Sequence, residues 1–411
     1  MSCRLFLLLI FSFFLCIVSH GCKESDDAGG GNRVLEPGDS AARTVLVYIM
    51  AENDLTTNVR SDLWEMKYGT EALPDSCYLL AFVDDVNVPY ICRFHKNSSN
   101  VSLCDTVCKF KEDFYSTDTI KFKEVVTWVL DKYPSENFGL VMWSHGTGWL
   151  YDTDKNKSIG IDNGKNTDDN ISPSARWMEV EELAGVLENL PVKTDFVFFD
   201  ACFMQCVEVA YAMRESADWL VGSPAELPAN GAPYDRIIPS LFSFPFDAEE
   251  LIVQYKNAYP EDDGVLLSAV RSSAMDRLAQ VTAMYVPAYF SRDSLVDDSG
   301  VFSYLPGGYF SYYTDYPDYP DYPDMNGQMM MRLSNDAYLQ WKEAFDEAVP
   351  YKVASMKWSS AFDYEPHDVN FLQYGGLSMY VPREQSEYST FNSCFKKTEW
   401  YNVTGWGNAG W

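Results

Sequence analysis

Basic residues are scarce in this 411-residue sequence. Lysine and arginine together number 31, against 60 aspartate and glutamate residues, so the formal net charge is −29. Nucleic acids and anionic membrane surfaces are bound through clusters of basic side chains. The charge therefore argues against both as partners. It fits either a soluble surface or a preference for cationic substrates, and it does not choose between them.

Motifs of several enzyme classes are also missing. The sequence contains no P-loop, no G-x-S-x-G and no H-E-x-x-H, which argues against P-loop nucleotide hydrolysis, nucleophile-elbow serine hydrolases and zincin-type metalloproteases. Only four histidines are present. Cys104 and Cys108 have a metal-like spacing, but the one histidine near them is His95. We therefore expect buried thiols or a local disulfide there, and no metal site.

The N-terminal residues have the pattern of an export signal. Arg4 precedes an apolar stretch over 5–18 that is too short to span a bilayer, so residues 1–21 are predicted to be a signal peptide. Gly21 and Cys22 resemble a bacterial lipoprotein cleavage site, which would make Cys22 the lipidated residue. Ordinary secretion is the alternative. Residues 22–42 form a polar flexible tether. We expect an extracytoplasmic, membrane-anchored lipoprotein, and the acidic tether leaves exposure at the cell surface open.

Strand-like and helix-like patterns alternate through the first two thirds of the chain. Strands are expected at 44–50, 77–83, 139–143, 196–199 and 219–223, and helices at 119–132, 178–190 and 207–215. Asp54 can cap a further helix that ends near residue 68, Asp118 precedes the helix at 119–132, and Pro134 terminates it. Two short strands, 90–95 and 102–110, read as a hairpin. The alternation predicts an α/β domain over 43–260 with a mostly parallel sheet and helices on both faces.

The pattern changes after residue 260, where a C-terminal α+β region over 261–411 is expected to pack on the first domain. Its predicted elements are strands at 265–270 and 376–381 and helices at 274–290 and 336–349. A Tyr-Pro-Asp repeat fills residues 316–324, and proline at every third position excludes a helix or a central strand. We expect a rigid exposed ribbon. The alternative is an acidic loop that attracts calcium, and calcium is the one cofactor that the sequence leaves open.

Two predicted strands end in residues that can carry chemistry. The apolar run 196–199 is typical of a strand buried on both faces, and Asp200 and Cys202 follow it directly. A second run, 139–143, leads to His145 in a glycine-rich turn. Open α/β sheets bind their ligands at the carboxyl ends of strands. A thiol and an imidazole at two such ends suggest a nucleophile and its acid/base partner.

Each of these residues also has a plainer interpretation as part of the core. A lone cysteine after a strand is usually a small buried residue, and a lone histidine is more often a satisfied imidazole. The catalytic interpretation is favoured because Asp200 precedes Cys202 by two residues, the thiol lies at a strand-to-helix junction that should favour thiolate, and His145 adjoins an open turn. The other thiols and imidazoles singled out are expected to be structural or solvated: Cys206, His95 and His367.

Four stretches resemble the clostripain family of cysteine peptidases, which share the caspase-like fold. They are VYIMAENDL at 47–55, WSHGTGW at 143–149, FDACFM at 199–204, and GSPAE at 222–226 with PYD at 233–235. As a set they are specific and cover about 44–240, and 375–382 resembles the family's C-terminal part more loosely. The spacing agrees, because caspases place a histidine about fifty residues before the nucleophile and His145 precedes Cys202 by 57.

The resemblance implies a caspase-like three-layer sandwich and a His145–Cys202 dyad. In such a dyad Cys202 attacks the peptide carbonyl and His145 protonates the leaving amine, while backbone N–H groups of Gly146 and Cys202 hold the oxyanion. Asp200 inherits the family's role of binding an arginine or lysine side chain ahead of the scissile bond. A second acid of that pocket is replaced by Asn230 in this chain, which weakens the expectation of basic specificity.

Family members can also be activated by self-cleavage in the loop after the histidine strand. Here that loop is polar, spans 151–174, and offers three candidate sites: Lys155, Lys157 and Lys165. We therefore expect a secreted or membrane-anchored, monomeric cysteine endopeptidase that acts on proteins or peptides, cleaves after arginine or lysine and processes itself in this loop. The alternative is a catalytically inactive, caspase-like surface binding protein.

Overall fold

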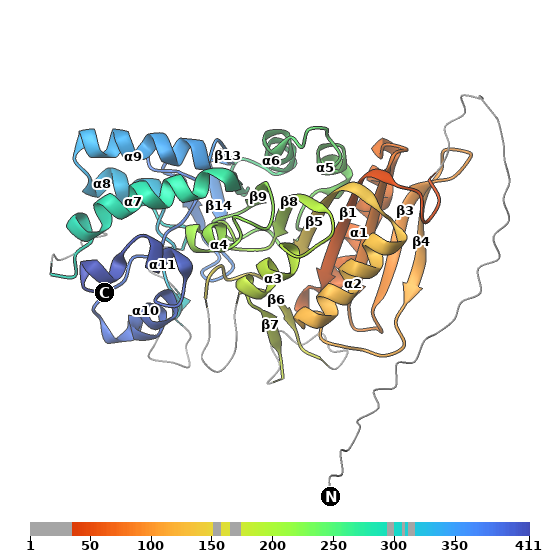
Figure 1. Ribbon diagram of the computed structural model, residues 1–411, viewed down its shortest axis with the longest axis horizontal. Helices are drawn as coiled ribbons and strands as arrows, with labels where there is room; N and C mark the ends of the chain where they lie inside the picture. The colour runs from red at the N-terminus through yellow and green to blue at the C-terminus, as the bar shows by residue number, and fades with distance from the viewer. Residues whose placement is uncertain (1–34, 151–157, 165–173, 294–299, 306–308, 311–316) are drawn as a thin grey trace, which may run out of the picture. The chain divides into compact units, whose positions relative to one another are not determined.

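The computed structural model describes residues 35–150, 158–164, 174–293, 300–305, 309–310 and 317–411 (Figure 1). These residues belong to one compact unit. The predicted signal peptide, Cys22 and most of the tether lie outside the described residues, as do Lys155, Lys157 and Lys165. Within the described ranges, no helix is both long and apolar enough to cross a bilayer.

A nine-stranded sheet runs through the molecule in the order β13-β10-β9-β8-β5-β1-β2-β3-β4. Its five central strands are parallel: β2 (Cys77–Asp84), β1 (Ala41–Met50), β5 (Ser135–Trp143), β8 (Lys193–Asp200) and β9 (Trp219–Gly222). Antiparallel strands complete both edges: β3 (Tyr90–Lys96) and β4 (Ser102–Lys109) on one side, β10 (Leu266–Arg271) and β13 (Tyr351–Ala354) on the other. The mostly parallel sheet is confirmed.

Helices cover both faces of the sheet, because the central strands are apolar on both sides (Figure 1). Leu46, Tyr48 and Met50 of β1 belong to one hydrophobic cluster, and Val45 and Val47 to the other. The first cluster is closed by α2 (Thr119–Lys132), α3 (Val180–Leu187), α4 (Val207–Ala212), α7 (Met275–Tyr289) and α9 (Asn335–Ala348). The second is closed by α1 (Val59–Gly69), α5 (Tyr234–Leu241) and α6 (Ala248–Asn257). The result is the three-layer sandwich predicted.

The chain beyond residue 260 contributes two strands to the central sheet. Strands β10 and β13 extend the central sheet, so the expected boundary at residue 260 runs through one continuous hydrogen-bonded structure. The remaining α-helices of the described residues are α8 (Met325–Arg332), α10 (Ser389–Phe395) and α11 (Glu399–Val403). The remaining strands form three small antiparallel pairs: β6 (Ile159–Asp162) with β7 (Arg176–Met178), β11 (Tyr309–Phe310) with β12 (Pro317–Tyr319), and β14 (Lys357–Ser359) with β15 (Pro366–Asp368).

Two expectations for the C-terminal region are wrong. The predicted strand at 376–381 is irregular, and only Ser378 forms isolated bridges, to Cys206 and Asp324. The described end of the Tyr-Pro-Asp repeat is not an exposed ribbon, because residues 320–324 are buried. The buried carboxylate of Asp324 explains this: it accepts hydrogen bonds from Tyr304 Oη, from Gly375 N and from the first turn of α8.

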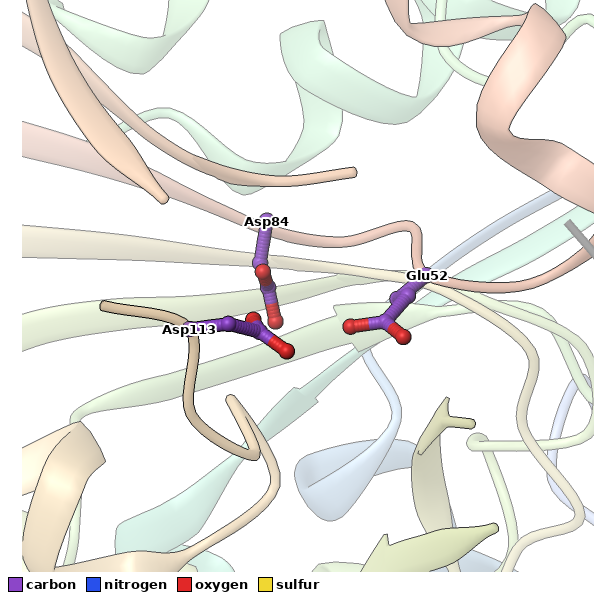
Figure 2. A group of neighbouring side chains, drawn as sticks. All are labelled: Glu52, Asp84 and Asp113. Atoms are coloured by element: carbon purple, nitrogen blue, oxygen red, sulfur yellow. The ribbon is translucent and has the colours of Figure 1, made fainter. Parts of the chain in front are cut away.

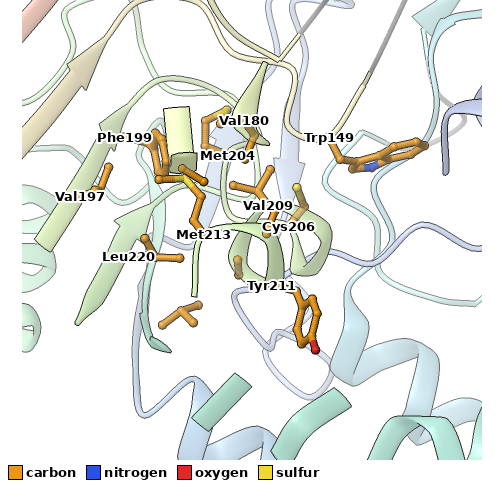
Figure 3. Packing of buried hydrophobic residues seen from close by; sticks show 14 of the residues in the cluster. Trp149, Val180, Val197, Phe199, Met204, Cys206, Val209, Tyr211, Met213 and Leu220 are labelled. Atoms are coloured by element: carbon orange, nitrogen blue, oxygen red, sulfur yellow. The ribbon is translucent and has the colours of Figure 1, made fainter. Parts of the chain in front are cut away.

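The described cysteines are all free thiols, and Cys104 is exposed and Cys108 half-buried. The expectation of buried thiols or a local disulfide at these two residues is therefore wrong. Cys206 is fully buried, as expected for a core residue. Figure 3 shows it with Val209 and Tyr211 of α4 and with Phe199 of β8, in the cluster beneath the turn that follows β8.

The buried carboxyl group of Glu208 makes the stability of the fold depend on pH. Burial raises its pKa to about 7, although Oε1 accepts a 2.8 Å hydrogen bond from Tyr380 N. Between the unfolded pKa and 7, the folded chain therefore keeps a proton that the unfolded chain releases. The free energy of unfolding falls as pH rises through this range, because the buried carboxyl group must then either stay protonated or ionise without water.

We expect Glu208→Gln to reduce the loss of unfolding free energy between pH 5.5 and pH 8.5 by about 1–3 kcal/mol. The measurement is urea unfolding of wild type and variant at both pH values. Glu136→Gln, on the exposed side of β5, is the control and should behave as wild type. Equal pH dependence in Glu208→Gln and wild type would contradict this assignment.

Candidate active site

The ends of two neighbouring parallel strands bring His145 and Cys202 together. Trp143, the last residue of β5, is the register partner of Asp200, the last residue of β8. The two chains continue side by side, because a Cβ on Gly146 would lie only 2.5 Å from the carbonyl oxygen of Cys202. Residue 146 therefore has to be glycine, and this close approach sets the imidazole and the thiol on adjacent segments.

The imidazole of His145 is held by a carboxylate from the segment after β1. His145 Nε2 lies 2.8 Å from Asp54 Oδ1, and this hydrogen bond is the main cause of the lowered pKa of Asp54. Because a carboxylate can only accept, Nε2 carries the proton and Nδ1 is the nitrogen left for proton transfer. No hydrogen bond joins His145 and Cys202 among the described residues.

The segment that carries Asp54 is fixed by buried hydrogen bonds. Asn53 donates through Nδ2 to the carbonyl oxygens of Met50, at 3.0 Å, and Ile161, at 2.8 Å. Ser144 Oγ donates to the same Met50 oxygen at 2.7 Å. The side chain of Asn53 also caps the short helix that begins at Asp54. The expected capping role of Asp54 is therefore wrong: its neighbour caps, and Asp54 is free to reach the imidazole.

Cys202 is half-buried, and its surroundings favour the thiol over the thiolate. Burial and the nearby carboxylate of Glu226 together raise the pKa of Cys202 to about 12, although Leu227 N donates to Sγ at 3.3 Å. Helix α4 begins only at Val207, so its N-terminus does not adjoin the sulfur. The expectation of a thiolate-favouring helix end is wrong.

The turn after Cys202 is strained and supported from the C-terminal region. Phe203 has φ of 60°, an uncommon backbone conformation for a bulky side chain. Its ring stacks on that of Tyr322, with centroids 4.4 Å apart, and Tyr322 Oη donates to Thr147 O at 2.9 Å. Tyr322 therefore links the turn after the cysteine to the turn after the histidine. The Tyr-Pro-Asp repeat gave no sign of this role.

Asp200 is buried beneath the loop at 228–233. Its Oδ2 accepts 3.0 Å hydrogen bonds from Ala232 N and Tyr234 Oη, while burial raises the pKa of Asp200 to about 6. Gly231 covers this oxygen so closely that a Cβ there would lie 3.1 Å from it. Asn230, its neighbour, is exposed, and no hydrogen bond joins it to Asp200.

Two further carboxylates of α1 surround Asp200 and were missed in the sequence. Asp62 is buried and its Oδ2 accepts a 2.7 Å hydrogen bond from Trp143 Nε1; burial and Asp200 raise its pKa to about 8. Glu65 Oε2 accepts from Tyr234 N at 3.1 Å. Their spacing on one helix face, three residues apart, was the available signal, but it is common on exposed helices.

Comparison with known proteins identifies the family. The family model described as the Clostripain family matches residues 47–411. The chain belongs to the Clostripain family. Clostripain of Hathewaya histolytica is 25% identical over 224 residues, which is 47% of this chain and 41% of that protein, so the match spans about two fifths of the relative's length.

Solved structures of Clostripain-family (C11) peptidases share the fold. A secreted C11 cysteine protease from Bacteroides thetaiotaomicron, in complex with an irreversible peptide inhibitor, superimposes with a TM-score of 0.76 at 28% identity, over 89% of this chain and 99% of that one. An inactive zymogen C11 protease from Parabacteroides distasonis gives a TM-score of 0.74, with the same identity and coverage. The predicted family and caspase-like fold are confirmed.

The contact between Gly146 and Cys202 can be tested by one added methyl group. Gly146→Ala should lower the free energy of unfolding by about 1–3 kcal/mol, because the new Cβ meets backbone that has to move. Gly185→Ala is the matched control: residue 185 lies in α3 with nothing within 4 Å of an added Cβ, so it should stabilise by about 0.5–1 kcal/mol. Urea unfolding measures both, and a neutral Gly146→Ala would refute the close approach.

Proposed function

We propose that this member of the Clostripain family is a cysteine endopeptidase in which Cys202 is the nucleophile and His145 the acid/base. The observation that carries the proposal is the placement of these two residues after register-paired positions of β5 and β8. A third residue, Asp54, orients the imidazole, which completes the nucleophile–base–orienter arrangement of covalent catalysis.

Proton transfer follows from the hydrogen bond of Asp54. With Nε2–H donating to Asp54, Nδ1 takes the proton of the Cys202 thiol as sulfur attacks the substrate carbonyl. The imidazolium that forms is stabilised by the Asp54 carboxylate and then gives its proton to the leaving amine. A water molecule, deprotonated by the same nitrogen, hydrolyses the thioester and returns the enzyme to its starting state.

Two backbone N–H groups are proposed to stabilise the oxyanion. Gly146 N–H and Cys202 N–H donate to no residue among those that the structure describes. Cys202 N–H belongs to the residue that carries the sulfur, and Gly146 packs against the Cys202 carbonyl. Each N–H can therefore donate to an oxygen that develops negative charge during attack. Such donors act only once the peptide is bound.

A preference for arginine or lysine before the scissile bond is supported by the carboxylates beneath the 228–233 loop. Asp200 is the inferred contact, and Asp62 and Glu65 are further carboxyl groups that can ionise when a cation binds, which Asn230 cannot do. Without a cation, the charged forms of Asp62 and Asp200 repel one another. A substrate ammonium or guanidinium group bound between them would favour the ionisation of both. Asp62 and Glu65 are thus proposed to take the place of the second acid, which this chain replaces with Asn230.

The uncut chain is proposed to be a precursor that becomes active after cleavage in the 151–174 loop. The raised pKa of the Cys202 thiol and the lack of a hydrogen bond to His145 are the properties expected of an inactive form. Lys155, Lys157 and Lys165 remain the candidate cleavage sites. Secretion with a lipid anchor at Cys22, a monomeric state, and protein or peptide substrates complete the proposal.

Substitution of the three site residues separates their roles. Cys202→Ala and His145→Ala should abolish peptide cleavage, and Asp54→Asn should lower kcat by about 10²-fold or more with little change in KM, because the orienting carboxylate is lost. The measurements are steady-state kinetics and the pH profile of kcat/KM on loop-cleaved protein. Cys104→Ala, which removes an exposed thiol, is the control and should keep full activity. Activity retained in Cys202→Ala would exclude the mechanism.

Specificity is tested by a peptide-library cleavage profile. Wild type should cut after arginine or lysine, and Asp200→Asn should lower kcat/KM for these substrates by about 10–100-fold, as expected when a buried charge partner is removed. Asp235→Asn, in the first turn of α5, serves as the comparison. A profile without basic preference would retire the role of Asp200. Complete inertness of the loop-cleaved protein would favour the alternative of a surface binding protein.

A further inference from the structure

Two thiols share one face of the hairpin that β3 and β4 form at the outer edge of the central sheet (Figure 1). Cys104 of β4 is the register partner of Phe94. Two positions along the ladder, Cys92 of β3 is the partner of Thr106. Paired residues of an antiparallel ladder point to the same side, and residues two apart on one strand share a face. Cys92 and Cys104 are therefore diagonal neighbours on the face that packs toward α1.

A β-bulge separates Cys104 from the other thiol of its own strand. The register shifts between Ile91 and Cys92, and Val107 is the extra residue of β4. Cys108 therefore faces Ile91 and packs, as Ile91 does, against the hydrophobic cluster on the opposite face of the sheet. The thiol next to Cys104 is thus that of Cys92, on the neighbouring strand.

The two thiols differ in access and in acidity. Cys104 is exposed, whereas Cys92 is 1% exposed. Their side chains are hydrogen-bonded, and this hydrogen bond is the main reason why the pKa of Cys104 is lowered and that of Cys92 is raised. The ammonium group of Lys67 also lowers the pKa of Cys104, while burial and Asp105 act in the opposite direction. Cys104 is thus the accessible nucleophile and Cys92 the thiol behind it.

Cys104 borders a hollow between α1 and the hairpin, where a small molecule can approach the sulfur. The hollow has a volume of about 300 Å³, within the range of small-ligand sites. Trp64 of α1 and Tyr90 of β3 give it apolar walls. Its lining contains two basic residues, Arg60 and Lys67, and one acid, Asp85. A molecule with carboxylate groups can therefore come close to the sulfur although the chain as a whole is acidic.

We propose that Cys104 and Cys92 form a thiol pair that reacts with low-molecular-weight disulfides and closes to an internal disulfide bond. An accessible nucleophilic thiol with a resolving thiol beside it is the arrangement of redox-active cysteine pairs. The structure holds both residues as free thiols, which is the reduced form of the pair. The inference is independent of the proposed peptidase function, because neither residue belongs to that site.

The reaction consists of two successive thiol–disulfide exchanges. The Cys104 thiolate attacks one sulfur of a disulfide RSSR, forms a mixed disulfide with one RS group and releases the other as RS⁻. The Cys92 thiol then attacks the Cys104 sulfur, gives up its proton and displaces the second RS⁻. In total the two protein thiols lose two electrons and two protons to RSSR, which leaves as two molecules of RSH.

The edge position of β4 allows the pair to close. Among the described residues, β4 is the last strand of the central sheet, so it can shift toward β3 without separating a second pair of strands. Cys92 is fixed more firmly, because it is also the register partner of Ala81 in β2. The two sulfurs already contact one another and have to approach only to bonding distance. The bond would fasten the outer strand to the sheet.

The test is incubation of the full chain with oxidised glutathione at neutral pH, followed by trypsin digestion without reductant and mass spectrometry. The chain carries Cys202→Ala, which removes a competing thiol. We expect peptide 68–93 to be joined to peptide 97–109, with the loss of two titratable thiols and recovery of both by dithiothreitol. Each peptide contains a second cysteine, so Cys77→Ser and Cys108→Ser are the matched controls and should still form the link.

Substitution of the pair separates attack from closure. Cys92→Ser should stop at the mixed disulfide of Cys104 with glutathione. Cys104→Ser should leave Cys92 unmodified, because glutathione does not reach the buried sulfur. Lys67→Gln should slow the modification of Cys104 at least about twofold, because the thiolate loses a neighbouring cation.

Three results would overturn the proposal: no reaction of Cys104, glutathione that stays on Cys104 while Cys92 is present, and a link that persists in Cys104→Ser. Circular dichroism establishes that each variant is folded. If a variant is not, the time course of the chain with both thiols decides, since the mixed disulfide has to appear before the link and then disappear. None of these readouts uses peptide cleavage, so a negative result leaves the peptidase proposal intact.

Discussion

The contact between the backbones that follow β5 and β8 is the constraint on which the site depends. Trp143 and Asp200 are register partners, and Gly146 packs against the carbonyl of Cys202 without room for a side chain. Because both strands are buried and apolar on both faces, neither can slide without exposing core residues. Residues separated by 57 positions in the chain are thereby held on adjacent segments, which is the use that parallel α/β sheets make of their carboxyl ends.

Carboxyl groups recur around the two strand ends. Asp54 meets the imidazole, and Asp200 lies beneath the neighbouring loop with Asp62 of α1. Each of the buried acids is more costly to ionise than an exposed one, as the raised pKa values of Asp62, Asp84 (Figure 2) and Asp200 indicate. A cationic group of a substrate bound beside Asp62 and Asp200 would lower the electrostatic cost of ionising them.

Local patterns predicted the sheet and the positions of His145 and Cys202, because buried strands and amphipathic helices have strong signals of their own. Helix α2 begins and ends where its cap and its terminating proline indicated. Long-range contacts gave no such signal. Asp54 looked like a helix cap and proved to be the partner of His145, and Tyr322 lay in a proline-rich repeat whose burial depends on stacking with Phe203. The thiol pKa of Cys202 was mispredicted because burial, not a helix end, dominates it.

The most direct measurement of the central claim is to map the residue modified by an irreversible peptidyl ketone with a lysine at its reactive end. The account predicts that mass spectrometry of the loop-cleaved protein finds one adduct, on Cys202, and that His145→Ala forms it far more slowly. An adduct on a different cysteine, or none after cleavage of the loop, would contradict the account.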